Sequence, residues 1–433
     1  MDNNAQEKRI IFHIDVNSAF LSWSAVKRLR EDPDALDLRT VPSAVGGDVA
    51  TRHGIITARS IPAKKYGVTT GEPVAQALKK CPDLILVRSD FETYREYSHQ
   101  FMDILRSYSR TVEQASVDEA FVDVTESIAE ILGLETVDPA DPAVRAEAVK
   151  IADMIRLNVR RALGFTVNVG ISTNKLLAKM ASDFKKPDLT HQLWPEQIPE
   201  KMWPLPIGDL FGCGPKTAAK LESMGIKTIG DAADMDLTLL RMLLGESSGE
   251  YIHGAANGMG GDKVRVEREA AKSYSNETTT AEDITTENYD VQAPVILKRL
   301  SDNVSARLRK DSVKGFTVTV TAKTSDFRRH SRQTRLEKAT DDAKVIFDSS
   351  VKLLKALMFG EGGEPGLYAD QSGVRLLGVG VSNLTHGDEE ETQITLEDFS
   401  KAQKKRDPKL DSLLDDINRK FGSGTIRRGG KKE

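Results

Sequence analysis

The sequence predicts an α+β protein of several domains, and three observations support that fold class. First, 433 residues exceed what one hydrophobic core usually organises, which gives an expectation of about two to four domains. Second, short apolar runs alternate with helix-periodic segments through about the first 190 residues. Third, a small helical region separates these from another set of helix and strand patterns.

The composition is that of an ordinary soluble protein, with 29% charged and 39% hydrophobic residues. The polar segment 1–9 lacks the apolar stretch of a secretory signal, and no apolar run approaches the length that spans a bilayer. The two cysteines, Cys81 and Cys213, lie far apart, which argues against a disulfide framework or a cysteine zinc site. We therefore expect a cytoplasmic protein with no membrane segment, and nothing demands more than a monomer.

Charge is distributed unevenly along the chain. The formal net charge of −4 argues weakly against a nucleic-acid-binding protein. Between Lys298 and Arg335, however, eleven Lys and Arg residues stand against three Asp, a local balance of +8. This stretch is a candidate nucleic-acid surface, and a solvated face is the alternative interpretation.

Hydrophobic periodicity predicts the elements in order. In the first part of the chain, it predicts strands at 10–16, 55–58, 120–124 and 165–171. Spacings of three and four predict helices at 17–29, 73–80, 90–110, 144–163 and 176–184. After a helical region at 204–260 and a polar segment at 264–277, the patterns predict helices at 298–310 and 343–358 and strands at 316–323 and 374–382.

Three acids stand at the ends of predicted buried strands. Asp15 closes the first strand, and the pair Asp118 and Glu119 immediately precedes another. A carboxylate buried at such a position is costly unless it is paired or bound to a metal. On neighbouring strands, the three carboxylates would suit two Mg²⁺ ions, which can stabilise the attacking and leaving oxygens of an in-line displacement. Chance is the competing explanation, because the chain holds 65 Asp and Glu residues.

Two further patterns suit phosphate groups. Four lysines lie at the start of, within or just after the helix that follows the fourth predicted strand, where they either meet phosphates or line a solvated helix face: Lys175, Lys179, Lys185 and Lys186. Gly212 and Gly214 form a Gly-x-Gly hairpin that leads into a helix, whose free backbone N–H groups could bind phosphate without reading bases. The hairpin is typical of a DNA-gripping helix-hairpin-helix, and a purely structural turn is the alternative.

Together these pieces resemble the Y-family of translesion DNA polymerases. The resemblance covers roughly residues 8–385, and its motifs stand in the family's order and spacing. The stretches that carry it are IDVNSAF at 14–20, GIITARSIPAKKYGV at 54–68, SVDEAFVDVT at 116–125 and VGISTNKLLAKMASDFKKP at 169–187.

The resemblance implies a right-hand polymerase architecture, with a palm, small fingers, a helix-hairpin-helix thumb and a C-terminal little finger that grips DNA. It places the palm at 1–20 and 89–193, the fingers at 21–88, the thumb at 194–262, a linker at 263–273, the little finger at 274–386 and a flexible tail at 387–433. The +8 stretch falls in the little finger, where it would contact the primer–template backbone in a salt-sensitive way.

The resemblance also assigns roles to residues. The implied ligands of two Mg²⁺ ions, with Mn²⁺ as a substitute, are the catalytic carboxylates of Asp15, Asp118 and Glu119 and the backbone carbonyl of Val16. The positions implied to contact the incoming deoxynucleoside triphosphate are Ser18, Ala19, Phe20, Lys64 and Lys186, with Phe20 as the steric gate against a 2′-hydroxyl. The implied DNA-binding positions of the hairpin are Gly212, Gly214, Lys216 and Thr217.

Three positions depart from the common family pattern. Lys64 stands where many relatives have Arg, which keeps the charge but loses a bidentate fork. Ile61 replaces a phosphate-contacting Tyr, and Asn17 replaces an acid. These departures bear on how tightly the triphosphate binds rather than on the chemistry.

The implied activity is template-directed, low-fidelity addition of deoxynucleotides to a primer 3′ end, without proofreading. A tail peptide, TQITLEDF at 392–399, is weakly similar to sliding-clamp-binding peptides, with Gln393 and Leu396 as anchors. The principal competing hypothesis is a catalytically inactive polymerase-like accessory protein that binds DNA, although the presence of all three acids argues against it. A nuclease, a nucleotide cyclase and a bare DNA-binding module also compete with the polymerase interpretation.

Overall fold

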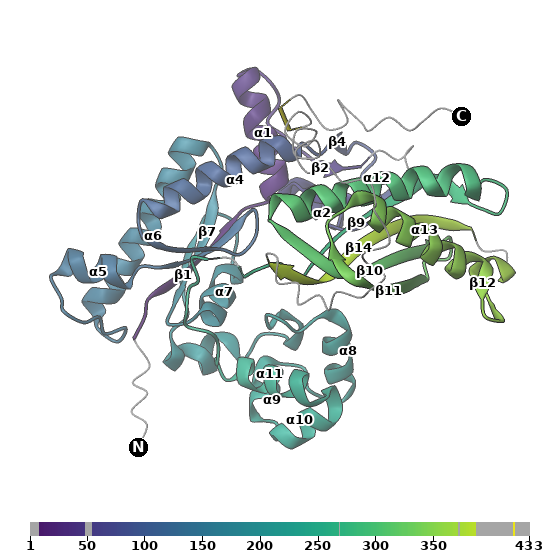
Figure 1. The fold of residues 1–433 in the computed structure, drawn as a ribbon. Helices are drawn as coiled ribbons and strands as arrows, with labels where there is room; N and C mark the ends of the chain where they lie inside the picture. Colours follow the sequence, from purple (N-terminus) through teal and green to yellow (C-terminus); the bar gives the residue numbers. More distant parts are fainter. Residues whose placement is uncertain (1–7, 48–53, 268, 371–372, 387–418, 421–433) are drawn as a thin grey trace. The chain divides into compact units, whose positions relative to one another are not determined.

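The computed structural model describes residues 8–47, 54–267, 269–370, 373–386 and 419–420 (Figure 1). The chain divides into two units, residues 1–269 and 270–433. Among the described helices, none is both long and apolar enough to cross a membrane.

A five-stranded sheet at the centre of the first unit carries the predicted acids. Its strand order is β5-β6-β1-β7-β8, with β7 and β8 parallel and the other pairs antiparallel. The middle strand β1 therefore hydrogen-bonds to β6 on one side and to β7 on the other. The bounds are β1 Ile11–Val16, β5 Thr111–Gln114, β6 Glu119–Asp123, β7 Val167–Ser172 and β8 Thr190–Gln192.

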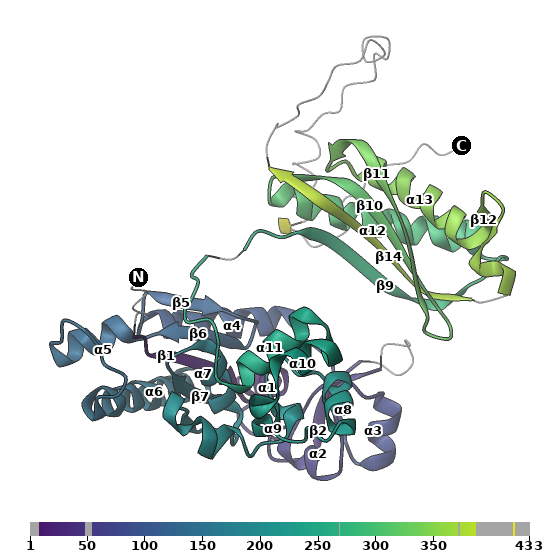
Figure 2. The same cartoon turned by 90° about the horizontal axis from the view of Figure 1, so that it is seen from below.

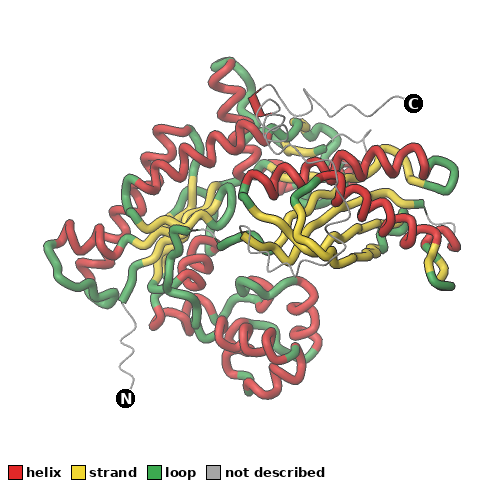
Figure 3. The backbone as a smooth tube through the Cα atoms, in the orientation of Figure 1, coloured by secondary structure: helices red, strands yellow, loops and turns green. Residues whose placement is uncertain are grey.

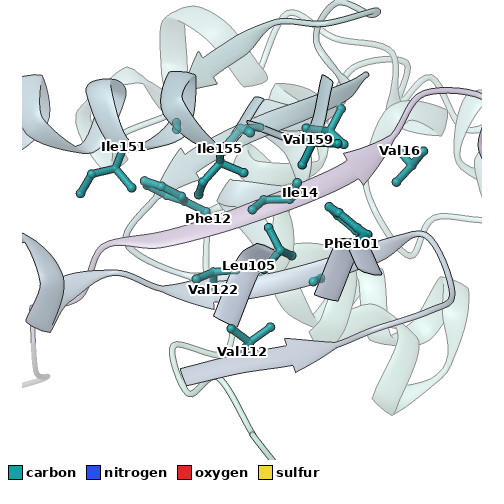
Figure 4. Close-up of a cluster of buried hydrophobic side chains, with 14 of the residues drawn as sticks. Phe12, Ile14, Val16, Phe101, Leu105, Val112, Val122, Ile151, Ile155 and Val159 are labelled. Carbon is teal, nitrogen blue, oxygen red and sulfur yellow. The ribbon is translucent and has the colours of Figure 1, made fainter. Parts of the chain in front are cut away.

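Helices cover both faces of this sheet, and all six residues of β1 are consequently buried. Phe12 and Ile14 point into a core built with α4 and α6 (Figure 4). On the opposite face, Ile11 packs near Ala178 of α7, and His13 hydrogen-bonds to the same helix. The helices are α4 Phe91–Arg106, α6 Pro142–Leu163 and α7 Lys175–Asp183, and the short α5 spans Thr125–Leu132.

The segment between β1 and α4 forms a small subdomain with a three-stranded sheet, ordered β3-β2-β4. Its core is built mainly from small residues, such as Ala44, Ala63 and Ala77, around Ile56 and Val74. The elements are α1 Ala19–Glu31, β2 Ser43–Gly46, β3 Ile56–Arg59, α2 Ile61–Lys65, α3 Val74–Lys80 and β4 Ile85–Val87.

A helical region follows β8, and Figure 3 shows it as helix and loop throughout. Its core includes Leu221 and Ile252, and Leu177 and Met180 of α7 belong to the same cluster. The helix α7 therefore joins the central sheet to the helical region. The helices are η2 Pro195–Gln197, η3 Ile198–Met202, η4 Ile207–Asp209, α8 Pro215–Ser223, α9 Ile229–Asp234, α10 Leu237–Leu244 and α11 Glu246–Ala256.

The second unit is a four-stranded antiparallel sheet, ordered β11-β10-β14-β9, with two helices on one face (Figure 2). Val318, Val320 and Ala322 of β10 pack into the core under these helices. The elements are β9 Ser273–Ile284, α12 Tyr289–Lys310, β10 Val313–Thr324, β11 Arg329–Thr340, α13 Ala343–Phe359, β12 Gly360–Glu361, β13 Glu364–Pro365, η5 Leu367–Asp370 and β14 Val374–His386.

The structure corrects the predicted elements in both units, and four strands of the first unit, β2, β4, β5 and β8, were not predicted. The helix predicted at 298–310 begins at Tyr289, because the turn before Pro294 is helical despite the proline. The strands β9 and β11 were not predicted, and β9 begins inside the predicted polar segment 264–277. β11 alternates exposed Arg, Ser and Gln with half-buried residues, so it lacks the apolar alternation that predicts a strand.

Candidate active site on the central sheet

The register of the central sheet places Asp15 between two polar neighbours. Asp15 pairs with Glu119 of β6 and with Asn168 of β7. Directly opposed strand residues share a face of the sheet, so these three side chains lie together on the face under α7. The backbone N–H of Val16 donates to the Asp118 carbonyl at 3.0 Å. The three predicted acids therefore lie at the C-terminal end of β1, with Asp15 and Glu119 on adjacent strands and Asp118 just before β6.

Two lysines neutralise the paired carboxylates. Lys179 Nζ lies 2.5 Å from Glu119 Oε1, and Lys186 forms an ion pair with Asp15. Lys186 also lies 2.8 Å from Asp183. The interpretation of the α7 lysines as a solvated face is wrong, because Lys179 is buried and Lys175 pairs with Glu113 at 2.8 Å.

The pKa of Asp15 is raised, whereas that of Glu119 is lowered. Burial raises the pKa of Asp15, and Lys186 opposes that shift. The His13 ring and then Lys179 lower the pKa of Glu119 to about 2, against the effect of burial. His13 Nε2 lies 3.7 Å from Glu119 Oε2, beyond hydrogen-bond reach, so the 2.5 Å contact with Lys179 is the direct one.

His13 is a buried residue of this site that the sequence did not identify. Its Nδ1 lies 2.8 Å from the Ser182 hydroxyl and its ring lies 4.8 Å from that of Phe121, while its Nε2 has no hydrogen-bond partner among the described residues. Burial lowers the pKa of His13, which favours the neutral ring. The signal was available, because His13 stands two residues before Asp15 and so shares its face of the strand.

The residues of the site fit hard divalent cations by their chemistry. Asp15, Asp118 and Glu119 supply oxygen donors, which Mg²⁺ prefers. Asp118 is half-buried, and its carboxylate accepts a hydrogen bond from Ser116 at 2.6 Å. In the described part of the chain, no three acidic, His or Cys side chains converge on one ion position, and ammonium groups partner two of the acids.

The turn after β1 holds the predicted nucleotide-binding residues. Ser18 is exposed in a left-handed conformation with φ 49°, and α1 begins directly after it with no side-chain cap. Ala19 is buried. Phe20 is half-buried and stacks on Tyr94 with a centroid distance of 4.6 Å and an interplanar angle of 11°. Tyr94 therefore fixes the ring of Phe20, a support that only the structure reveals.

Lys64 lies apart from the acids in sequence, on the five-residue helix α2. Its side chain is exposed, as is that of its neighbour Ile61. The Ser60 hydroxyl starts this helix by accepting from the N–H of Ala63 at 3.0 Å and donating to the carbonyl of Val41 at 2.8 Å. Lys64 is thus presented to solvent on a firmly anchored turn.

The predicted hairpin has the expected shape. Gly212 adopts φ 85°, and a Cβ there would meet the Tyr251 ring at 2.4 Å, so only glycine fits. Helix α8 starts at Pro215 directly after Gly214, with no side-chain cap. Gly214 has no side chain that could accept from the first N–H groups of this helix. Lys216 is exposed and Thr217 is half-buried at the same helix start.

The second unit presents a polar sheet face away from its helices. Since Val318, Val320 and Ala322 face the helices, Thr319, Thr321 and Lys323 occupy the other face. Their partners on that face are Gln333, Ser331 and Arg329 of β11 and Gly380, Gly378 and Leu376 of β14. Most of the residues on this face are small, and exposed cationic side chains lie along β11 at its edge. The predicted clamp anchors Gln393 and Leu396 lie outside the described residues.

Comparison with known proteins identifies this combination of domains. The impB/mucB/samB family matches residues 14–183, its C-terminal domain matches 271–396, and the IMS family HHH motif matches 195–226. A solved Y-family DNA polymerase chimera superposes with a TM-score of 0.68 at 21% identity, covering 87% of this chain and 100% of that chain. The architecture is therefore that of a Y-family polymerase, which confirms the predicted right-hand fold.

Curated relatives match along the full length. DNA polymerase IV of Clostridium acetobutylicum is 39% identical over 97% of both chains. DNA polymerase IV 1 of Bacillus subtilis is 34% identical over 99% of this chain and 94% of that protein. The chain belongs to the impB/mucB/samB family of Y-family DNA polymerases, together with these bacterial proteins.

The first prediction concerns the ionisation of Glu119. Its folded-state pKa of about 2 lies below the ordinary 4.5, so the folded state binds fewer protons. The ionised carboxylate therefore stabilises the fold above about pH 4.5, and this contribution is lost as pH falls toward 2, with an upper limit of about 3 kcal/mol. In metal-free urea unfolding, wild type should lose free energy of unfolding more steeply than Glu119→Gln below about pH 4.5. If the free energy of unfolding changed equally with pH in wild type and Glu119→Gln, this account would be contradicted.

Proposed function

We propose that this chain adds deoxynucleotides to a primer 3′ end under the direction of a template, with low fidelity, during translesion synthesis. The observation that carries the proposal is the cross-strand pairing of Asp15 with Glu119 beside the Asp118 backbone. Membership of the family that includes bacterial DNA polymerase IV supports it. The retained acids disfavour an inactive accessory protein.

Asp15, Asp118, Glu119 and the Val16 carbonyl would hold two divalent ions, with Mg²⁺ as the expected metal and Mn²⁺ as a substitute. When bound, such ions lower the pKa of the primer hydroxyl and neutralise the leaving pyrophosphate. Lys179 and Lys186 keep the carboxylates charged and oriented. Lys186 is exposed, so its ammonium group can leave Asp15 and bind a phosphate oxygen instead.

The incoming triphosphate has a natural cradle in the turn after β1. The Ser18 side chain does not cap the start of α1, and a helix dipole favours anions at this end of the helix. Lys186 adds a cation beside Asp15, and Lys64 adds one from α2. Phe20 is the second residue of α1 and would place its ring under the sugar of the nucleotide, where it would exclude a 2′-hydroxyl.

Primer–template DNA would be held by backbone contacts. The start of α8 with Gly212, Gly214, Lys216 and Thr217 supplies one phosphate site, and the open face of the second sheet supplies another. Both contact types are independent of base identity, as a polymerase requires. The small fingers subdomain, built on small core residues, would press lightly on the nascent pair. Absence of proofreading, a sliding-clamp partner and action as a cytoplasmic monomer are parts of this proposal.

The acids give the direct test of the proposed chemistry. Asp118→Asn and Glu119→Gln keep side-chain size but weaken metal ligation, so primer extension with Mg²⁺ should fall on the order of a thousandfold. The dissociation constant for primer–template, measured by fluorescence anisotropy, should stay within about threefold of wild type. Glu126→Gln, an exposed acid on α5, is the matched control. Near-normal extension by either site variant, or trimming of the primer by wild type, would sink the proposal.

The steric gate predicts a change in sugar selectivity. Replacing Phe20 with Ala removes the ring that Tyr94 supports, so the ratio of ribonucleotide to deoxynucleotide incorporation should rise by at least about tenfold. Single-nucleotide primer extension with matched dNTP and rNTP measures the ratio, and deoxynucleotide addition by the same variant is the internal control. An unchanged ratio in an active variant would show that Phe20 is ordinary packing.

The open sheet face predicts a salt-dependent contribution to DNA affinity. Lys323→Ala with Arg335→Ala should reduce the slope of log affinity against log salt by about two and weaken binding by about tenfold at low salt. The control pair is Lys352→Ala with Lys355→Ala, lysines of α13 in the helix layer. Equal effects of the two pairs would show that general charge, and not this face, binds DNA.

A further inference from the structure

The loop that carries Lys186 is held by two asparagines. Asn168 is fully buried on β7, directly opposite Asp15, and Asn17 is buried just after β1. Asn17 Nδ2 donates to Asn168 Oδ1 at 3.1 Å. This amide pair links the end of the central strand to the loop that follows α7.

Every hydrogen-bonding position of the Asn168 amide is used. Its nitrogen donates to the carbonyls of Ser182 at 3.1 Å and Lys185 at 2.7 Å. Its oxygen accepts from Asn17 and from the backbone N–H of Leu189 at 3.3 Å. The four contacts fix the orientation of the amide. If its nitrogen and oxygen were exchanged, the oxygen would face two carbonyl oxygens and the nitrogen would face two N–H donors.

The second asparagine completes the anchoring of the loop. Asn17 Oδ1 accepts from the backbone N–H of Asp188 at 3.0 Å and from the Thr166 hydroxyl at 2.9 Å. The loop is therefore fixed at Lys185 on one side and at Asp188 and Leu189 on the other. Lys186 stands between these anchors, with its ammonium group on Asp15.

An outer contact holds the same loop from α6. Arg156 binds the Asp188 carboxylate at 3.0 Å and also donates to the Asp188 carbonyl. Asp188 adopts a left-handed conformation with φ 57°, which is uncommon for residues other than glycine. The loop thus has one conformation that the amide pair and Arg156 jointly define.

We propose that Asn168, acting with Asn17, is a positioning residue that sets the affinity for the incoming triphosphate by fixing the backbone of Lys186. The inference rests on the proposed function, in which Lys186 contacts the triphosphate. A lysine on a four-carbon stem loses much rotational freedom when it binds a phosphate, and a fixed backbone lowers that cost. The amide pair acts through Lys186 and touches no reacting atom.

Asn168→Leu tests the proposal, because leucine has the branching of asparagine without its hydrogen-bonding groups and adds no charge beside Asp15. The KM for dNTP in steady-state primer extension should rise by about tenfold, while kcat changes by less than about threefold. Hydrogen exchange at the amides of Asp188 and Leu189, measured by mass spectrometry, should accelerate in the same variant. Asn257→Leu is the matched control, since Asn257 donates to the carbonyls of Ala233 and His253 in the thumb.

A double-mutant cycle identifies the route of the effect. In a Lys186→Ala background, Asn168→Leu should change the KM by less than about twofold, because its effect passes through Lys186. The same rise in KM with and without Lys186 would overturn the proposal, as would an equal loss of kcat and DNA affinity. If Asn168→Leu does not fold, Arg156→Gln on α6 replaces it, with a smaller rise in KM expected.

Failure of the proposal is distinguishable from failure of the proposed function. A wild-type chain that adds no nucleotide would overturn the proposed function. Wild-type addition together with an unchanged KM in folded Asn168→Leu would overturn only the positioning role.

Discussion

The register of β1 between β6 and β7 is the constraint on which the candidate site depends. It sets Asp15 opposite Glu119 on one side and Asn168 on the other. A slip of one residue would turn Asp15 toward the apolar core and expose Phe12 to the polar face. Phe12 and Ile14, packed under α4 and α6, oppose such a slip. The hydrophobic core therefore fixes the chemistry on the opposite face of the same strand.

Helix α7 packs against both the central sheet and the helical region, and so connects the site to the rest of the first unit. Lys179 and Ser182 face the sheet, where they contact Glu119 and His13, while Leu177 belongs to the core of the helical region that follows β8. The loop after α7 then returns Lys186 to Asp15. A carboxylate that is shielded from water requires a nearby opposite charge, and these two lysines supply it. The fold thus assembles the site and balances its charge.

The sequence predicted the elements that are strongly apolar and the site residues that fall in recognisable motifs. The strands around Asp15 and Glu119 were predicted because both sheet faces are covered, which leaves continuous apolar runs. β11 escaped prediction because one of its faces is solvated and cationic. His13 and Asn168 were missed because a polar residue in a strand shows its purpose only through its cross-strand neighbours. The ion pair between Lys179 and Glu119 was missed for the same reason, because it forms only through tertiary contacts.

The most direct test of the two-metal site is anomalous diffraction from a crystal that contains the chain, primer–template DNA, a non-hydrolysable dNTP analogue and Mn²⁺. The account predicts two manganese peaks in contact with the carboxylates of Asp15, Asp118 and Glu119, with Lys186 turned toward the triphosphate. A complex with DNA and nucleotide in place but no manganese at these carboxylates would contradict it.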